Sequence, residues 1–285
     1  MAKKFRFMLV ACLSMIVLAG CSGDKKETAT KKEDASDKIV ENGILKVATS
    51  GTLYPTSFHD QETSELTGYE VEVVKELAKR LDLEVNFEEM GIDGMFSAVN
   101  SGQVDMAAND IDITESRKEK FDFSTPHKYS YGSMIVREDD LSGIHKMEDL
   151  KGKKSAGGAT TIYMQISEGF GAEPIIYDNV TNDQYLMDVG NGRTDVVLND
   201  FYLQSMAVKA FPDLGVKIHP DLFYNPTSAG LVIKKGNTNL LEKVNDTLAE
   251  MEKDGTLKEL SEKFFGGADV SVEPDVEITA DVKVD

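Results

Sequence analysis

Residues 69–87, with the sequence YEVEVVKELAKRLDLEVNF, decide the fold class. Val73, Val74, Leu77 and Leu81 recur at helical spacing, which predicts an amphipathic helix over residues 69–81. Short β-branched runs at residues 44–48 and 84–87 flank this helix and are typical of strands. A helix between two strands is the repeating unit of a parallel sheet with crossover helices.

The same alternation continues along the chain. Residues 94–101 are predicted to be helical and residues 105–108 to form a strand. It starts again near residue 149, with strands at 153–156, 173–177 and 195–198, helices at 160–167 and 182–191, and two closing helices at 239–254 and 257–265. The sequence therefore predicts an α/β protein with two doubly wound lobes.

The composition excludes several classes of function. The chain has 285 residues with 31 Lys+Arg against 50 Asp+Glu, a formal charge of −19. Such a surface repels phosphate backbones, so we expect no nucleic-acid partner. Two cysteines, Cys12 and Cys21, and four scattered histidines give neither a disulfide framework nor the spacing of a zinc site. We therefore expect no metal and no cofactor.

The first residues predict export. Lys3, Lys4 and Arg6 precede an apolar run over residues 7–20 that is too short to span a bilayer core of ~30 Å. Residues 1–20 are therefore predicted to be a signal peptide. The run ends in Leu18-Ala19-Gly20-Cys21, which resembles the lipobox of bacterial lipoproteins.

The lipobox resemblance implies cleavage before Cys21 and a lipid on that cysteine, with localisation outside the cytoplasmic membrane. Two acyl chains give a stable anchor, whereas one is marginal. An ordinary secreted protein with an incidental cysteine is the alternative. Residues 21–38 are polar and are predicted to be a lipidated flexible tether. Residues 268–285 are acidic, and we expect a solvated tail there rather than an extra edge strand.

Several segments together resemble the polar amino-acid solute-binding proteins of bacterial ABC importers. They include LTGYEVE at 66–72, SGQVD at 101–105, ITESRK at 113–118 and GRTD at 192–195. The resemblance covers about residues 40–267 and implies a periplasmic-binding-protein-like fold of type II, with two lobes joined by a two-strand hinge that closes on ligand. It implies a first lobe at 39–133 plus 229–267, a second at 134–228, and crossings near 133–136 and 224–230.

Residues 50–52, 91–95 and 197–200 are most similar to the cystine/cysteine-binding subgroup of this family. The resemblance implies a monomeric binding protein, not an enzyme, that delivers a free amino acid to an ABC permease and ATPase complex. Cystine or cysteine is the favoured ligand. The alternatives are another polar or aliphatic amino acid, such as glutamine or methionine, or a dehydratase that uses the same fold on a carboxylate substrate.

The resemblance also implies two charged ligand contacts. Arg117 matches the arginine of the family's Thr-x-x-Arg motif and is expected to hold the ligand carboxylate, since a guanidinium offers a bidentate fork. Asp200 matches the aspartate that receives the ligand ammonium, at the carboxyl end of a predicted strand. The alternatives are a surface arginine within the basic run 117–120 and an aspartate that only caps a helix.

The remaining expected contacts surround these two. Thr160 and Thr161 follow a glycine-rich turn that can aim N–H groups and hydroxyls at a carboxylate, although Thr160 could instead simply cap the next helix. Leu53, beside Tyr54, and Ile92 stand where the family usually has aromatic rings, so the resemblance implies largely aliphatic walls.

Two departures bear on the ligand's side chain. Basic-amino-acid binders tend to carry an acid where this chain has Ser50, which argues against lysine and arginine. Asp112 stands where a serine or threonine is usual. It could pair with Arg117, face solvent, or meet a second ammonium such as that of cystine.

Overall fold

The computed structural model describes residues 42–177, 180–280 and 282. The predicted signal peptide, the tether and Cys21 lie outside the described residues. Within the described part of the chain, no helix is long and apolar enough to cross a membrane.

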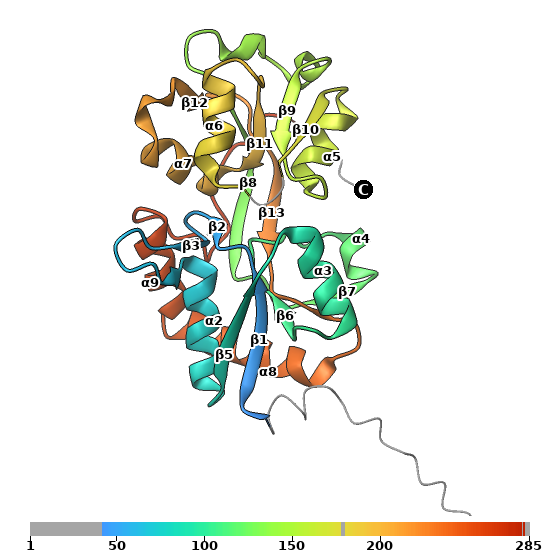
Figure 1. Cartoon of the computed structure of the whole chain (residues 1–285), viewed down its shortest axis with the longest axis vertical. Coiled ribbons are helices and arrows are strands. Elements are labelled where there is room, and N and C mark those ends of the chain that lie inside the picture. The colour runs from blue at the N-terminus through green and yellow to red at the C-terminus, as the bar shows by residue number, and fades with distance from the viewer. Residues whose placement is uncertain (1–41, 178–179, 281, 283–285) are drawn as a thin grey trace, which may run out of the picture. The chain divides into compact units, whose positions relative to one another are not determined.

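A five-stranded sheet forms the centre of the first lobe (Figure 1). Its strand order is β5-β1-β6-β14-β7, with β5 and β6 parallel to β1 and with β14 antiparallel to both of its neighbours. The parallel part is the predicted alternation of strand and helix. The bounds are Ile44–Thr49 (β1), Glu84–Glu89 (β5), Met106–Ala107 (β6), Phe121–Phe123 (β7) and Val232–Lys234 (β14), and a small separate sheet joins Thr52–Leu53 (β2), Ser57–His59 (β3) and Leu66–Thr67 (β4).

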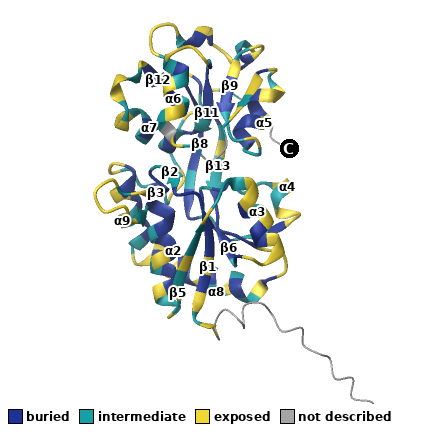
Figure 2. Cartoon of the chain, viewed as in Figure 1, coloured by how far each residue is buried: buried dark blue, intermediate teal, exposed yellow. Residues whose placement is uncertain are grey.

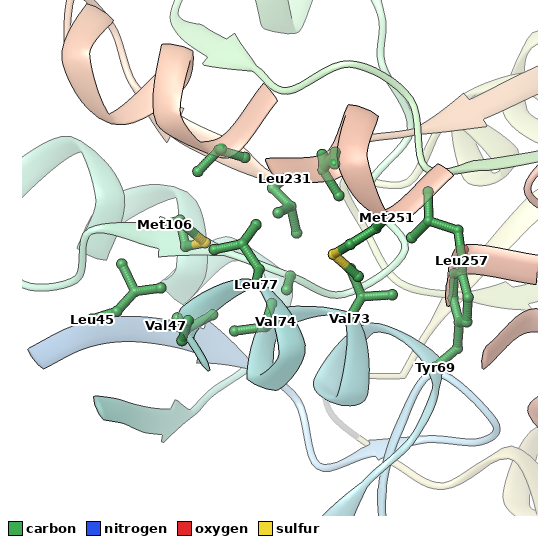
Figure 3. Close-up of a cluster of buried hydrophobic side chains, with 14 of the residues drawn as sticks. Leu45, Val47, Tyr69, Val73, Val74, Leu77, Met106, Leu231, Met251 and Leu257 are labelled. Atoms are coloured by element: carbon green, nitrogen blue, oxygen red, sulfur yellow. The ribbon is translucent and has the colours of Figure 1, made fainter. Parts of the chain in front are cut away.

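Helices cover both faces of this sheet. Successive side chains along a strand point to opposite faces, and here both sets are buried against helices. Leu45 and Val47 of β1 pack against α2, α8 and α9 on one face, while Ala48 packs against α3 on the other. Figure 3 shows Val73, Val74 and Leu77 of α2 within the first of these clusters, as their spacing predicts. The helices are Tyr69–Arg80 (α2), Ile92–Ser101 (α3), Glu115–Lys118 (α4), Thr238–Lys253 (α8) and Thr256–Phe264 (α9).

The second lobe is built around β8, which is buried along almost its whole length (Figure 2). Met134 and Val136 of β8 pack toward α5, whereas Ile135 packs toward α6 and α7. The strands are Lys128–Arg137 (β8), Lys154–Gly157 (β9), Glu173–Ile176 (β10), Val197–Asp200 (β11), Val216–Ile218 (β12) and Tyr224–Ala229 (β13). The helices are Ile162–Gly169 (α5), Asn182–Gly190 (α6) and Phe201–Ala210 (α7), with short 3₁₀ turns at Leu141–Gly143, Met147–Leu150 and Pro212–Leu214.

Two antiparallel strands, β8 and β13, run between the lobes (Figure 1). They pair from Lys128 with Ala229 to Gly132 with Tyr224. Residues 133–136, where the outward crossing is predicted, instead pair with β11 and β12 inside the second lobe. The pairing with β13 lies just before these residues, because the apolar side chains 134–136 pack inside the second lobe. The lobe boundaries themselves stay predictions.

The C-terminal segment differs from the solvated tail that its acidity predicts. Val270 is fully buried, and its carbonyl accepts a hydrogen bond from the Tyr129 N–H at 2.7 Å. Farther along, Thr279 donates its N–H to the Phe223 carbonyl, and Ala280 forms a β-bridge with Tyr224. The interspersed apolar residues therefore hold the segment against both lobes, although the only strand contact in its described part is this single bridge.

Candidate functional site

A cavity of 230 Å³ lies between the two lobes and is lined by both. Its lining combines apolar side chains with a few polar and charged groups, which is the usual composition of a small-molecule site. The first lobe contributes residues 50, 52, 53, 91–93, 109–112 and 117, and the second contributes 135, 157–159, 161, 163, 176, 177, 180, 185, 186, 197–199, 203, 204 and 207.

Arg117 lies on the short helix α4 and lines this cavity. Its Nη1 donates to the backbone carbonyl of Asp112 at 2.7 Å, and its Nη2 donates to that of Thr160 at 3.1 Å. The guanidinium also sits over the ring of Phe96, 5.4 Å from its centroid. Burial lowers the pKa of Arg117 and nearby Asp112 opposes that shift, but an arginine stays charged in proteins. This fixed, partly desolvated cation can receive a carboxylate, unlike a surface arginine.

Asp200 is the last residue of β11 and caps α7, as one reading of the sequence predicts. Its Oδ1 accepts the Leu203 N–H at 2.8 Å, and its Oδ2 accepts a hydrogen bond from Lys128 Nζ at 2.5 Å. Asp200 does not line the cavity, although Asn199 does. Arg117 and Asp112 therefore line the cavity, whereas Asp200 is not among the described residues that line it.

Lys128 and Asp110 were not among the residues singled out from the sequence. Lys128 Nζ also lies 3.0 Å from the Asp110 carboxylate, so one ammonium bridges two aspartates. Burial alone lowers the pKa of Lys128, but Asp110 and Asp200 raise it overall, which keeps the ammonium charged. Burial raises the pKa of Asp110 well above its usual range, with Lys128 acting in the opposite direction. Lys128 is the one charged residue in the stretch 128–136, and this is the sequence signal that could have revealed the cluster of Lys128, Asp110 and Asp200.

Asp112 lines the cavity, and its backbone contacts both Arg117 and the hinge strand β13. Its backbone forms a β-bridge with Ala229, and among the described residues no other side chain or N–H group hydrogen-bonds to its carboxylate. Burial raises its pKa to about 7, although the nearby Arg117 lowers it. Arg117 donates to the backbone carbonyl of Asp112 rather than to its carboxylate, and the role of Asp112 toward a ligand stays a prediction.

The two threonines take different places. Thr161 lines the cavity and caps α5, accepting the Met164 N–H at 3.1 Å, so the cap is Thr161 rather than Thr160. Thr160 does not line the cavity; its hydroxyl donates to Asp93 Oδ1 at 2.6 Å, across the gap between the lobes. With the Arg117 contact to its carbonyl, Thr160 connects the lobes twice.

Both lobes contribute aliphatic side chains to the cavity, but only the second lobe contributes aromatic rings. Leu53 and Ile92 line the cavity from the first lobe, whereas Tyr54 does not line it and packs edge-on against Phe58. The second lobe adds the aromatic residues Tyr163, Tyr177 and Tyr185. Most of the apolar lining is thus aliphatic, as predicted, and the three rings come from residues outside the motif positions.

A sequence profile of the bacterial extracellular solute-binding proteins, family 3, matches residues 45–267. The chain belongs to this family. This solute-binding protein is 60% identical over 265 residues to the probable ABC transporter extracellular-binding protein YckB of Bacillus subtilis, with 92% of each chain covered. A crystal structure of YckB aligns with a TM-score of 0.71, covering 87% of this chain and 99% of that one.

Two further relatives carry more specific names. The L-cystine-binding protein TcyA of Bacillus subtilis is 35% identical over 267 residues, covering 93% of this chain and 98% of TcyA. The ancestral amino acid-binding protein AncCDT-1, a precursor of cyclohexadienyl dehydratase, has a TM-score of 0.73 at 31% identity, covering 81% of this chain and 99% of that one. The family and its two-lobed α/β fold are thus confirmed for this extracellular solute-binding protein.

Proposed function

We propose that this solute-binding protein captures a free amino acid in the cavity between its lobes and delivers it to the permease and ATPase of an ABC importer. The observation that carries the proposal is the setting of Arg117. Its charged guanidinium donates to two backbone carbonyls, and the residue lines a cavity to which both lobes contribute. A guanidinium in this setting matches a carboxylate by charge and by bidentate geometry. Gly158 and Thr161 line the same cavity.

Cystine or cysteine is the ligand that we favour. The support is the likeness to TcyA and the residues 50–52, 91–95 and 197–200 that resemble the cystine-type subgroup. Ser50, which lines the cavity, supplies no charge for a basic side chain. Glutamine and methionine are the alternatives that the mixed aliphatic and aromatic walls also accommodate.

A thermal-shift screen of the twenty amino acids plus L-cystine tests this function. A ligand at 100 times its dissociation constant adds ~2.7 kcal/mol to the stability of the folded state, which is readily measured. We expect L-cystine or L-cysteine to give the largest shift and L-arginine at most a small one. If no amino acid shifts the unfolding temperature, the proposed function is wrong.

A dehydratase is the second candidate, and one observation favours it. A carboxyl group with a pKa raised to about 7, as at Asp112, is suited to general acid catalysis near neutral pH. AncCDT-1 is described as a precursor of a dehydratase. Against an enzyme, neither histidine nor lysine is among the described residues that line the cavity. Loss of a cyclohexadienyl acid from solution, followed by NMR with purified protein, would establish the enzyme.

We also propose that the protein is a monomer anchored outside the cytoplasmic membrane by lipid on Cys21. The lipobox-like sequence supports the anchor. Cys21→Ala should leave amino-acid binding unchanged and should release the protein from the membrane fraction, with loss of fatty-acid labelling. A Cys12→Ala variant is the matched control and should be labelled normally. A Cys21→Ala protein that still incorporates label would contradict the lipid assignment.

A further inference from the structure

A third stretch of chain passes between the lobes beside the two hinge strands. Residues 268–280 follow α9, start on the first lobe and end on the second. Residues 273, 274, 276 and 278 of this segment line a groove together with residues 225–228 of β13. The segment is therefore a connection between the lobes in addition to β8 and β13.

Its first attachment, on the first lobe, is made by buried groups. Val270 is fully buried and packs in the same core cluster as α2, α8 and α9. Its N–H donates to Ser261 Oγ of α9 at 2.6 Å, and its carbonyl accepts the Tyr129 N–H of β8 at 2.7 Å. Ser261 Oγ in turn donates to the Ala268 carbonyl at 2.8 Å. Detaching this end would expose a core side chain and leave buried polar groups unpaired, so it stays attached.

The second attachment, on the second lobe, is made by an exposed residue. Thr279 Oγ1 accepts the Phe223 N–H at 2.9 Å and donates to the Asp221 carbonyl at 2.7 Å. The Thr279 N–H donates to the Phe223 carbonyl at 2.8 Å, and Ala280 forms the β-bridge with Tyr224. Water can replace the hydrogen bonds of an exposed residue, so this end is the weaker of the two.

The middle of the segment is held by side-chain contact alone. Within the described chain, residues 272–278 make no hydrogen bond and no ion pair. Their acidic side chains are exposed and the apolar ones between them are half-buried, at residues 273, 275 and 277 and at residues 274, 276 and 278, respectively. Such a stretch can lift away from its groove without breaking any backbone hydrogen bond.

The two attachments lie at opposite ends of the hinge. In the ladder between β8 and β13, Tyr129 pairs with Ser228 near one end, and Tyr224 pairs with Gly132 at the other. Opening and closing of two lobes bends the strands that join them. A chain fixed at both ends beside a bending ladder has to change its path or release one end. Attachment at Thr279 is therefore linked to the arrangement of the lobes.

The segment is attached at both ends in an arrangement where the lobes also touch. The Thr160 hydroxyl donates to Asp93 Oδ1 at 2.6 Å, and Arg117 Nη2 donates to the Thr160 carbonyl at 3.1 Å. Both contacts join one lobe to the other on the cavity side of the hinge. The attached second end thus accompanies the closed arrangement.

We propose that residues 268–280 form a releasable strap, which stabilises the closed arrangement of the lobes and detaches from residues 221–224 when the lobes open. The inference goes beyond the proposed function, because it concerns the lobes and not the identity of the ligand. The released end stays tethered through Val270, so it can rebind at an effective concentration on the order of millimolar.

Small-angle X-ray scattering of the ligand-free protein tests the strap. Thr279→Val keeps the side-chain shape but removes the hydroxyl that contacts Phe223 and Asp221. Deletion of residues 277–285 removes the whole second attachment. Both variants should have a larger radius of gyration than wild type, although the deletion shortens the chain. Glu277→Gln, an exposed residue of the same segment, is the matched control and should equal wild type.

Release of L-cystine, followed by stopped flow, should become about threefold or more faster in Thr279→Val and should not change in Glu277→Gln. If the screen selects another amino acid, that ligand takes the place of L-cystine. A radius of gyration in Thr279→Val equal to that of Glu277→Gln, or an unchanged release rate, overturns the strap. Thr279→Val decides alone if the deletion variant does not fold. Because the scattering needs no ligand, a protein that binds no amino acid would contradict the proposed function and leave this test in place.

Discussion

The two charged ends of an amino-acid ligand differ in how far a motif reveals the residues expected to contact them. At the carboxylate end, the Thr-x-x-Arg motif predicts Arg117, and the structure places its guanidinium in the cavity wall. At the amino end, the motif predicts Asp200, but Lys128 from another strand already donates a hydrogen bond to that carboxylate. A motif predicts the position of a residue in the fold. Whether the charge of that residue is already paired depends on partners that are distant in sequence. The predictions below test this contrast in order of expected effect.

Removing Lys128 should produce the largest change. Lys128→Met leaves Asp110 and Asp200 buried without their shared cation, and breaking a buried pair in this way costs about 3 to 5 kcal/mol of stability. Urea unfolding of the ligand-free protein measures it. The double variant Lys128→Met/Asp200→Asn removes one carboxylate as well and should recover most of the loss. Equal stability of Lys128→Met and wild type would show that the triad does not form.

At the carboxylate end, Arg117→Ala should abolish most of the affinity. Losing one partner of a desolvated charge pair costs about 2 to 5 kcal/mol, which is thirtyfold or more in affinity. Arg117→Lys should also weaken binding, because a point charge does not reproduce the bidentate fork. Titration of both variants with L-cystine checks this result, with circular dichroism as the control for folding. Affinity within threefold of wild type in Arg117→Ala would place the carboxylate elsewhere.

The amino end should respond to pH. Burial raises the pKa of Asp112, in the cavity wall, to about 7, so this carboxyl group gains its negative charge near neutral pH, and that charge attracts the ammonium of a bound amino acid. Affinity for an amino acid should therefore fall by up to about tenfold for each pH unit below 7 and level off above it. The groups whose charges act on Asp112 or respond to it are Arg117, Lys128, Asp110, Asp200, Tyr163 and Tyr224.

Asp112→Asn is the control for this pH effect, and its profile should be flat between pH 5.5 and 8 within about twofold. The variant should also be more stable than wild type at pH 8 without ligand. The sign follows because the raised pKa of Asp112 means that charging it disfavours the folded state, and this penalty is complete only above pH 7. A wild-type affinity that does not change with pH would contradict the effect expected from the raised pKa of Asp112.

The smallest effect should come from the contact that joins the lobes at Thr160. Thr160→Val removes the hydroxyl that donates to Asp93 but keeps the carbonyl that Arg117 uses. A single hydrogen bond contributes about 0.5 to 1.5 kcal/mol, so affinity should fall by roughly three- to tenfold. Stopped-flow measurements should place the change in dissociation, because the bond forms only when the lobes meet. An unchanged dissociation rate would mean that the contact does not hold the closed state.

The elements of the fold are largely predictable from local periodicity. The helix predicted at 69–81 is α2, and the stripe of Val73, Val74 and Leu77 does face the core. The crossing half of β8 is not predictable in this way, since Lys128 and Ser130 are polar yet buried. The burial of Lys128 depends on Asp110 and Asp200, which are distant in sequence and meet only in the folded chain.

The candidate site also contains residues that a motif predicts and residues that only the folded chain reveals. Arg117, Thr161, Leu53 and Ile92 lie where the motif places them, and all line the cavity. Tyr163, Tyr177 and Tyr185 belong to no motif, and only the packing of the second lobe brings their rings to the wall. Charge pairing and aromatic walls are therefore the features that needed the structure.

The measurement that tests the central claim most directly is a crystal structure of the protein with L-cystine bound. We expect the α-carboxylate on the Arg117 guanidinium, at about 2.7 to 3.0 Å. Lys128 should still contact Asp200. A ligand carboxylate that contacts no atom of the Arg117 guanidinium would contradict the account.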